Sequence, residues 1–254
     1  MPPSRAVVIR ETKDDVVALV SARFVSVIRA LHEGKQQVHV CLTGGTLGIA
    51  ILRAVARDPE SSNVDWKRVH FWWGDERWLP HDDAERNDKQ ATDALLSLID
   101  VPEDNIHRFA ASDGSETLDA AAGVYRAELA RLAEPDAIAP VFDITFLGVG
   151  PDGHVASLFP HFEQVNAEDA VVAVRDSPKP PPERLSLTFP VINNSDRIWL
   201  ALAGADKASA IGLALAGASR NLVPVAGVRA RLETVFFVDS EAATDVPREL
   251  VIDL

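Results

Sequence analysis

Short apolar runs alternate with helical patterns along the whole chain. Residues 38–42 and 69–73 are apolar almost throughout, as is typical of strands buried on both faces. Residues 47–57 and 87–99, which follow them, favour helices. Since neighbouring parallel strands need helical crossovers, the alternation predicts an α/β fold in three layers, α/β/α, around a largely parallel central sheet.

The same alternation continues to the end of the chain. It predicts further strands at residues 7–9, 141–149, 171–174, 185–189, 198–203 and 235–238, and further helices at residues 17–31, 117–133 and 206–215. The Pro-rich residues 177–182 form the only biased segment, and strand patterning resumes directly after them. We therefore expect a single domain, residues 1–254, in which this segment is a rigid loop able to flank a site.

Charge restricts the partners of this chain. It carries 25 Lys and Arg against 38 Asp and Glu, a formal net charge of −13, which disfavours nucleic acid. No apolar stretch is long enough to span a bilayer, and the single cysteine, Cys41, cannot form an internal disulfide. These features favour a cytoplasmic protein, and they suit a monomer or a homodimer equally. A small anionic substrate would bind only where cations gather.

A glycine turn, Gly44-Gly45-Thr46, joins the strand at 38–42 to the helix at 47–57. Ligands of open α/β sheets bind beyond the carboxyl ends of the strands, and the start of a helix offers free N–H groups to phosphate. No Gly-Lys-Ser/Thr follows, so this is not a Walker loop. A tight turn capped by threonine is the structural alternative.

Asp75-Glu76-Arg77 follows the strand at 69–73 in the same way. Arg77 is suited to grip a phosphate, while Asp75 or Glu76 is suited to bind sugar hydroxyls or to orient another side chain. A surface turn with a local ion pair is the alternative, worth about 0–1 kcal/mol.

Residues 148–153, Gly-Val-Gly-Pro-Asp-Gly, fit the dinucleotide fingerprint, and Asp176 lies near the spacing of a ribose partner. That fingerprint requires a helix to open through its third glycine, and Pro151, Asp152 and His154 crowd the turn instead. A better interpretation is a strained turn that presents His154 beside Asp152. Nicotinamide or flavin binding is therefore disfavoured.

His154 is the candidate general base, because an imidazole near pH 7 can take a proton from water and return it to a leaving group. A structural role is the default for the histidines elsewhere: His32, His39, His70, His81 and His107. His161 and Asp152 are alternative metal ligands with His154, but no recognised zinc spacing is present, so no metal is expected. Arg184, which opens a strand, and Lys207, after Gly204, complete the candidate cations.

Together these segments resemble the 6-phosphogluconolactonase family over essentially the whole chain. The resemblance is carried by Thr43-Gly44-Gly45-Thr46, Trp73-Gly74-Asp75-Glu76-Arg77, Asn87, residues 148–160 (GVGPDGHVASLFP), Arg184-Leu185-Ser186-Leu187-Thr188 and Lys207. It implies a Rossmann-like α/β/α fold and hydrolysis of 6-phospho-D-glucono-1,5-lactone in the pentose phosphate pathway, without a metal or an organic cofactor.

The resemblance also implies roles for single residues. His154 would activate water and Asp152 would orient it, while Gly44 and Gly45, with Arg77, Arg184 and Lys207 as candidates, would hold the 6-phosphate. It further implies that Thr46, Asp75 and Asn87 belong to the substrate-binding set. One departure is Arg86, where the family often has serine, which puts a peripheral contact in doubt.

Three alternatives remain at this stage. Glucosamine-6-phosphate deaminase has a similar turn, but that turn continues Ile-Ala-Phe-Asn-Glu-Pro, against Val-Ala-Ser-Leu-Phe-Pro at 155–160 here, and it has tyrosine at the position of Arg77. A non-catalytic sugar-phosphate sensor would not need both His154 and Asp152. A nicotinamide dehydrogenase would bind the dinucleotide, which an equilibrium titration would detect.

Overall fold

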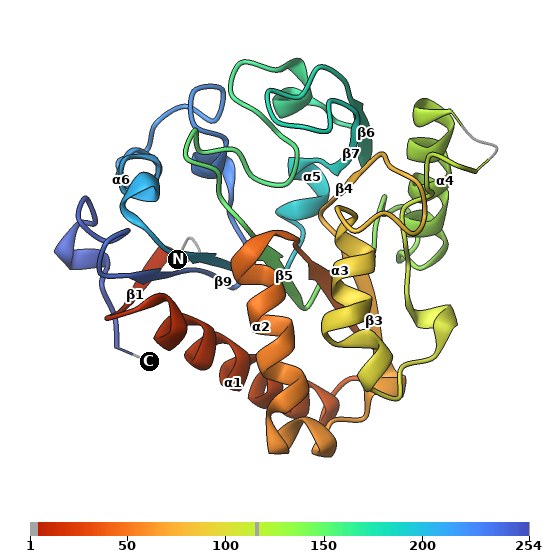
Figure 1. The fold of residues 1–254 in the computed structure, drawn as a ribbon, viewed down its shortest axis with the longest axis horizontal. Helices are drawn as coiled ribbons and strands as arrows, with labels where there is room; N and C mark the ends of the chain where they lie inside the picture. The colour runs from red at the N-terminus through yellow and green to blue at the C-terminus, as the bar shows by residue number, and fades with distance from the viewer. Residues whose placement is uncertain (1–4, 115–116, 254) are drawn as a thin grey trace.

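The computed structural model describes residues 5–114 and 117–253, and at its centre lies a six-stranded sheet in the order β1–β9–β8–β5–β2–β3 (Figure 1). The strands are β1 (Arg5–Arg10), β2 (Val38–Leu42), β3 (Val69–Trp73), β5 (Ile144–Leu147), β8 (Arg197–Leu202) and β9 (Glu233–Asp239). Every neighbouring pair runs parallel. The predicted α/β class and parallel central sheet are therefore confirmed.

Helices cover both sides of this sheet (Figure 1). They are α1 (Lys13–His32), α2 (Gly45–Arg57), α3 (Asn87–Ala94), α4 (Leu118–Arg131), α5 (Phe189–Ile192) and α6 (Ala208–Leu215). α1 begins where Thr12 and Asp15 form a reciprocal capping box, which satisfies two backbone N–H groups at the helix start. Its buried face repeats at helical spacing through Val20, Phe24 and Ile28, as the apolar pattern predicts.

A second, three-stranded sheet lies beside the first and corrects the prediction in one respect. It consists of β4 (Asp75–Arg77), β7 (Arg184–Leu187) and β6 (Val171–Val174) in that order, and both pairings are antiparallel. β6 and β7 therefore do not extend the parallel sheet. The nine residues between them, 175–183, contain no helix and are fewer than a parallel crossover needs.

Several element boundaries also differ from the prediction. β5 covers only the middle of 141–149, because Asp143 before it accepts a hydrogen bond from the His39 backbone N–H at 2.9 Å and pairs with Lys35. α3 ends at Ala94 rather than at residue 99, since Leu95 has left the helical region with φ −144°. Phe189, predicted in a strand, begins α5, and α6 starts two residues after the predicted residue 206.

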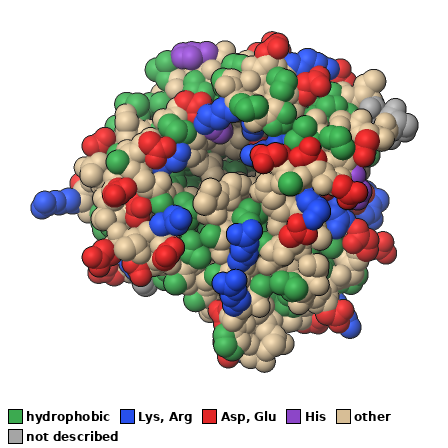
Figure 2. All heavy atoms as spheres, viewed as in Figure 1, with side chains coloured by type: hydrophobic (Ala, Val, Ile, Leu, Met, Phe, Trp, Pro, Cys, Tyr) green, Lys and Arg blue, Asp and Glu red, His purple; other side chains and the backbone are tan. Residues whose placement is uncertain are grey.

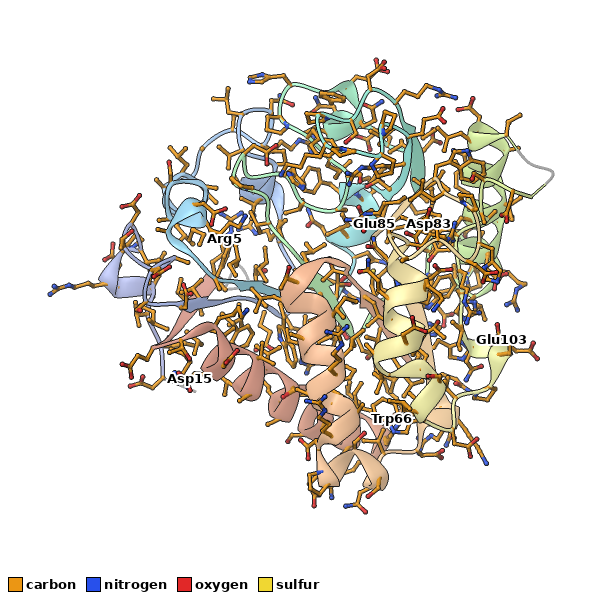
Figure 3. All side chains as sticks on the ribbon, viewed as in Figure 1. Arg5, Asp15, Trp66, Asp83, Glu85 and Glu103 are labelled. Atoms are coloured by element: carbon orange, nitrogen blue, oxygen red, sulfur yellow. The ribbon has the colours of Figure 1, made fainter. Side chains whose placement is uncertain are left out.

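Both sheets share one hydrophobic core, which includes Phe71 of β3 and Leu185 and Leu187 of β7. Arg5 links β1 to segments that are far from it in the sequence. The guanidinium of Arg5 on β1 donates to the carbonyl oxygens of Ala214 and Val228, which ties β1 to α6 and to the chain after it (Figure 3).

His39 and His70, near the amino-terminal ends of β2 and β3, form a stacked cluster with His107, away from the glycine turn. The rings of His39 and His70 lie 4.8 Å apart, and Nδ1 of His70 lies 2.9 Å from Nε2 of His107. Nδ1 of His107 in turn lies 2.7 Å from Oε1 of Glu128. Burial, and then the charge that neighbouring histidines would carry, lowers the pKa of His39 to about 3 and that of His70 to about 4.

This cluster predicts that mild acid destabilises the protein. Unfolded histidines bind protons near pH 6.5, whereas the folded chain excludes those protons until about pH 4 for His70 and 3 for His39. The stabilising contribution is thus complete above pH 6.5 and is lost as the pH falls. We expect urea denaturation to show a loss of about 4 kcal/mol between pH 7 and pH 5, about 2 kcal/mol from each of these two histidines. His70→Gln should reduce that dependence, whereas His81→Gln, on an exposed residue, should keep it. Stability that is equal at the two pH values in the wild type would contradict the prediction.

Candidate active site

A cavity of about 300 Å³ opens at the carboxyl ends of the parallel strands, where the three polar segments converge. Figure 2 shows a hollow above the start of α2, with basic and acidic side chains and a histidine around it. The cavity is lined by eight of the ten predicted site residues: Gly44, Gly45, Asp75, Arg77, Asn87, His154, Arg184 and Lys207. The other two lie beside it. Thr46 lines an adjoining cavity of about 440 Å³, and Asp152 contacts the His154 ring.

The His154 ring is held on two sides. Its Nδ1 lies 2.5 Å from Oδ1 of Asp152, and its centroid lies 4.6 Å from that of Phe159. It also rests on Gly150, where a Cβ atom would come within 2.1 Å of the ring. Only glycine permits this approach. No described residue forms a hydrogen bond with Nε2, and the side chain is 14% exposed, so this nitrogen is available to a ligand in the cavity.

The carboxylate of Asp152 fixes the state of this ring. Burial would raise the pKa of Asp152, but the hydrogen bond and the charge of His154 outweigh it and, with the charge of Lys179, lower that pKa to about 2. Asp152 is therefore ionised near neutral pH and accepts a hydrogen bond from Nδ1–H. The neutral ring then carries its lone pair on Nε2, the arrangement that a general base requires.

Asp75 and Asn87 form the opposite wall of the cavity. Nδ2 of Asn87 donates to the backbone carbonyl of Asp75 at 2.9 Å. Its Oδ1 lies so close to the glycine turn that a Cβ on Gly44 would be 1.8 Å away, so this position also requires glycine. Oδ1 of Asn87 is buried and accepts no hydrogen bond from any residue in the described ranges. It is an acceptor suited to a sugar hydroxyl.

The amino terminus of α2 faces the cavity with its backbone N–H groups. The helix begins at Gly45, which has a φ of +80°, and no side chain caps it at Gly44. The predicted alternative, a turn capped by a threonine side chain, is therefore wrong. Uncapped N–H groups at the start of a helix attract anions such as phosphate.

Arg184 lies on β7 with its guanidinium turned into the cavity wall, and it is only 4% exposed. Its Nε donates to the carbonyl of Pro181, and its Nη2 donates to those of Lys179 and Pro180 at 3.1 and 3.0 Å. These bonds hold the Pro-rich loop against the site, as the sequence predicts. Most of the hydrogen bonds that Arg184 donates go to neutral carbonyls, so its positive charge remains available to an anion.

Arg77 and Lys207 are held differently. Nη1 of Arg77 donates to the carbonyl of Glu85 at 2.7 Å, on the loop between β4 and α3 where Figure 3 labels Glu85. Nζ of Lys207 lies 2.9 Å from a carboxylate oxygen of Asp206, which neutralises part of its charge. The predicted ion pair between Arg77 and a neighbouring carboxylate is not formed within the described residues.

Lys179 is a cation of this site that the sequence reasoning does not identify. It lines the cavity, and its Nζ lies 3.8 Å from Oδ1 of Asp152. Burial lowers the pKa of Lys179, and the charges of Lys207 and Arg184 add to that effect. The sequence feature that could have identified Lys179 is its position in the Pro-rich loop, which is predicted to flank a site.

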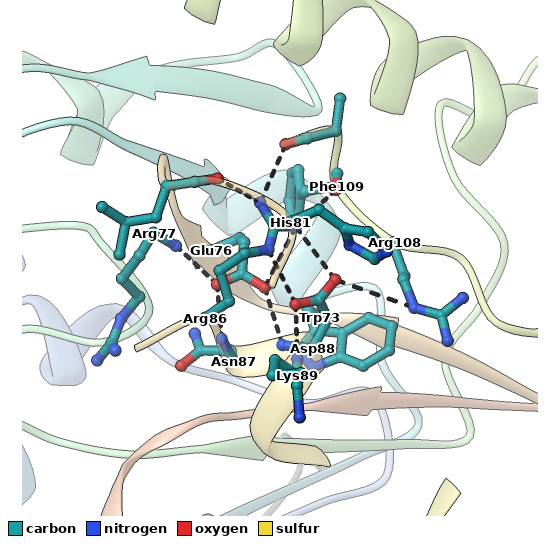
Figure 4. A network of polar contacts seen from close by, with 12 residues as sticks. Trp73, Glu76, Arg77, His81, Arg86, Asn87, Asp88, Lys89, Arg108 and Phe109 are labelled. Atoms are coloured by element: carbon teal, nitrogen blue, oxygen red, sulfur yellow. Dashed lines mark hydrogen bonds and ion pairs between the residues drawn. The ribbon is translucent and has the colours of Figure 1, made fainter. Parts of the chain in front are cut away.

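Glu76 and Arg86 belong to a buried network of polar contacts that also includes Asn87 of the site (Figure 4). The carboxylate of Glu76 accepts the backbone N–H groups of Asn87 and Asp88 at 2.7 and 2.9 Å, so it caps α3 rather than binding sugar. Arg86 is 1% exposed and forms two hydrogen bonds with Asp88, at 2.9 and 3.1 Å, and one with the carbonyl of Phe109. Arg86 is therefore buried inside this network, and it is not among the residues that line the cavity.

Two alternative interpretations of residues 148–154 find no support in the structure. The segment 148–162 forms turns and isolated bridges without a helix, so the dinucleotide fingerprint lacks the helix that would bind a pyrophosphate. In residues 5–114 and 117–253, no three His, Cys, Asp or Glu side chains are grouped so that they would hold a metal ion.

Within the same ranges, no helix has both the length and the apolar character that a membrane crossing needs.

Comparison with known proteins gives the family. Residues 11–237 match the model of the glucosamine-6-phosphate isomerases/6-phosphogluconolactonase family. This chain belongs to that family. The 6-phosphogluconolactonase of Mycobacterium tuberculosis is 44% identical over 247 residues, covering 96% of this chain and 99% of that protein. The one of Streptomyces coelicolor is 42% identical over 255 residues, covering 98% of each. The crystal structure of the Thermotoga maritima 6-phosphogluconolactonase is 29% identical, with a TM-score of 0.81, and covers 93% of this chain and 100% of that one.

Membership in this family agrees with the geometry of the cavity. The matched residues extend past both ends of the candidate site, from Gly44 on the first glycine turn to Lys207 before α6. The family match therefore covers all the elements that line the cavity and is not limited to a single motif.

Proposed function

We propose that this protein hydrolyses 6-phospho-D-glucono-1,5-lactone to 6-phospho-D-gluconate in the oxidative branch of the pentose phosphate pathway. The observation that carries the proposal is the His154–Asp152 pair, with Nε2 open to a cavity whose other end is lined by an uncapped helix start and by basic side chains. Relatives that are 42–44% identical over nearly the whole chain are named 6-phosphogluconolactonase.

In this proposal His154 acts twice. Its Nε2 takes a proton from water as the oxygen of that water attacks the lactone carbonyl carbon, which forms a tetrahedral intermediate with a negative oxygen. The intermediate collapses, the bond from the carbonyl carbon to the ring oxygen breaks, and protonated His154 returns the proton to the ring oxygen. Asp152 keeps Nδ1 protonated throughout and stabilises the positive ring between the two steps.

The remaining residues bind the rest of the substrate. The 6-phosphate lies against the N–H groups of Gly45 and Thr46 and the charges of Arg184 and Lys207, since Gly45, Arg184 and Lys207 line the cavity and Thr46 lines the adjoining one. Asp75, Asn87 and Gly44 line the wall that the sugar hydroxyls meet. Water and the side chains of this chain supply every proton and charge in the sequence of steps, so the reaction is proposed to proceed without a cofactor or a metal.

The cellular setting is part of the same proposal. A pathway that uses a soluble phosphosugar, together with an acidic chain of net charge −13, favours a cytoplasmic enzyme that does not bind nucleic acid. One hydrophobic core includes residues of both sheets, which favours a single domain over residues 1–254. The acidic surface suits a monomer or a homodimer.

The test of this function is lactone hydrolysis measured above the spontaneous rate. The lactone is generated in situ by oxidation of glucose 6-phosphate, and its loss is followed with and without protein. We expect kcat/KM for glucono-1,5-lactone without the phosphate to be lower by a factor of about 100 or more, since the charge-assisted contacts at the helix start are then missing. Loss of the phosphorylated lactone at the spontaneous rate would refute the function.

A further inference from the structure

Ser157 lies three residues after His154, and its hydroxyl is buried between the two charged walls of the cavity. The residue is 1% exposed. Its Oγ donates to Oδ2 of Asp75 on β4 at 2.8 Å and lies 3.5 Å from Nη1 of Arg184 on β7. Its backbone N–H donates to Oγ of Ser186, also on β7, at 3.1 Å. One small residue therefore joins the loop that carries His154 to both strands.

The position of this hydroxyl affects how two opposite charges interact. The Asp75 carboxylate and the Arg184 guanidinium both contact the Ser157 hydroxyl, yet the two form no ion pair in the structure. The Ser157 hydroxyl instead donates a hydrogen bond to Asp75, and its oxygen faces Nη1 of Arg184. A carboxylate that bonded Arg184 directly would neutralise it and would compete with any anion in the cavity.

We propose that Ser157 is a positioning residue that keeps Arg184 free of an ion pair with Asp75, and so available to the anionic group of the substrate, by occupying Oδ2 of Asp75. The inference rests on the proposed function only in taking phosphate as that group. It assigns to Ser157 no contact with the substrate and no part in the chemical steps. Its effect is on binding, because the charge that it preserves lies at the phosphate end of the cavity.

Inorganic phosphate is the probe, and calorimetric titration gives its Kd without any reliance on turnover. We expect Ser157→Ala to weaken phosphate binding about tenfold and to raise KM for the phosphorylated lactone by a similar factor, with kcat changed less than about threefold. Ser157→Cys, which keeps the shape but donates weakly, should lie between Ser157→Ala and the wild type. The cysteine variant also serves if the alanine variant folds poorly.

A second substitution separates this role from a merely structural one. If Arg184 is lost to Asp75 in Ser157→Ala, then adding Asp75→Asn should restore the phosphate Kd to within about twofold of that of Asp75→Asn alone. The matched control is Ser195→Ala. Ser195 is also fully buried and bonds Thr145 at 2.7 Å, but it precedes β8 at the opposite end of the sheet. That variant should lose stability and keep the wild-type Kd.

The outcomes decide between two separate failures. A wild type that neither binds phosphate nor hydrolyses the lactone overturns the proposed function. A wild type that does both, with an unchanged phosphate Kd in Ser157→Ala, overturns the role of Ser157. A weakened Kd that Asp75→Asn fails to restore also overturns it, because the loss would then come from disturbed packing and not from charge pairing.

Discussion

Replacing His154 with alanine is expected to lower kcat/KM for the phosphorylated lactone by about 10²- to 10⁴-fold. The substitution removes a cavity-facing imidazole whose Nδ1 is held by a carboxylate, and the attacking water then has no base at that position. Phosphate binding should change little, since the helix start and the basic side chains remain. The measurement is lactone loss above the spontaneous rate, together with the phosphate Kd.

His161→Ala is the matched control for that result. His161 belongs to the same segment as His154 but is exposed, and it is not among the residues that line the cavity. We expect wild-type kcat/KM in this variant. Equal clearance of the lactone by the wild type and by His154→Ala would show that another group acts as the base.

The second large effect is expected from Arg86→Met, which should lower the free energy of unfolding by about 3–5 kcal/mol. Arg86 is the buried cation beside two buried carboxylates, Glu76 and Asp88 (Figure 4). Methionine fills much of the volume but leaves both carboxylates without that charge. Burial, and then the charge of Asp88, already raises the pKa of Glu76, and Arg86 opposes that shift.

Urea denaturation measures this loss, and two further variants interpret it. Adding Asp88→Asn to Arg86→Met should recover part of the stability, because one of the stranded charges is then removed. Arg108→Met should cost only about 0–1 kcal/mol, since Arg108 is 23% exposed and its contact with Asp88 is 3.9 Å. Similar costs for Arg86→Met and Arg108→Met would mean that the network contributes little to stability.

The parallel sheet is predictable from the sequence because each of its strands is a local apolar run. β2 and β3 have the predicted bounds, 38–42 and 69–73, since β3 is buried along its full length, β2 at every residue except His39, and both are bounded by polar turns. β4 is different. Its three residues, Asp75, Glu76 and Arg77, are all charged, and such residues are depleted in strands. They form a strand only because β7 lies alongside to pair with them.

The positions of the site residues follow a similar division. The glycine turn, the segment 75–77 and the turn at 148–154 are each recognisable locally, and parallel strands bring their carboxyl ends to one edge of the sheet. The hydrogen-bond and ion-pair partners of each cation cannot be predicted in this way. Arg184 bonds carbonyls of a loop that folds back onto it, and that same loop delivers Lys179 to the cavity.

The amino-acid order by itself determined the α/β class, the three turns that carry polar groups and the choice of His154 beside Asp152, because each depends on residues close together in the chain. Only the tertiary structure decided which partners each charged group has inside the protein. Glu76 caps a helix, and Arg86 is held in a buried network. The charge of Arg184 is not neutralised, because its N–H groups donate hydrogen bonds to neutral carbonyl oxygens. The physical reason is that desolvation and hydrogen-bond partners depend on contacts between segments far apart in the chain, and no local pattern records them.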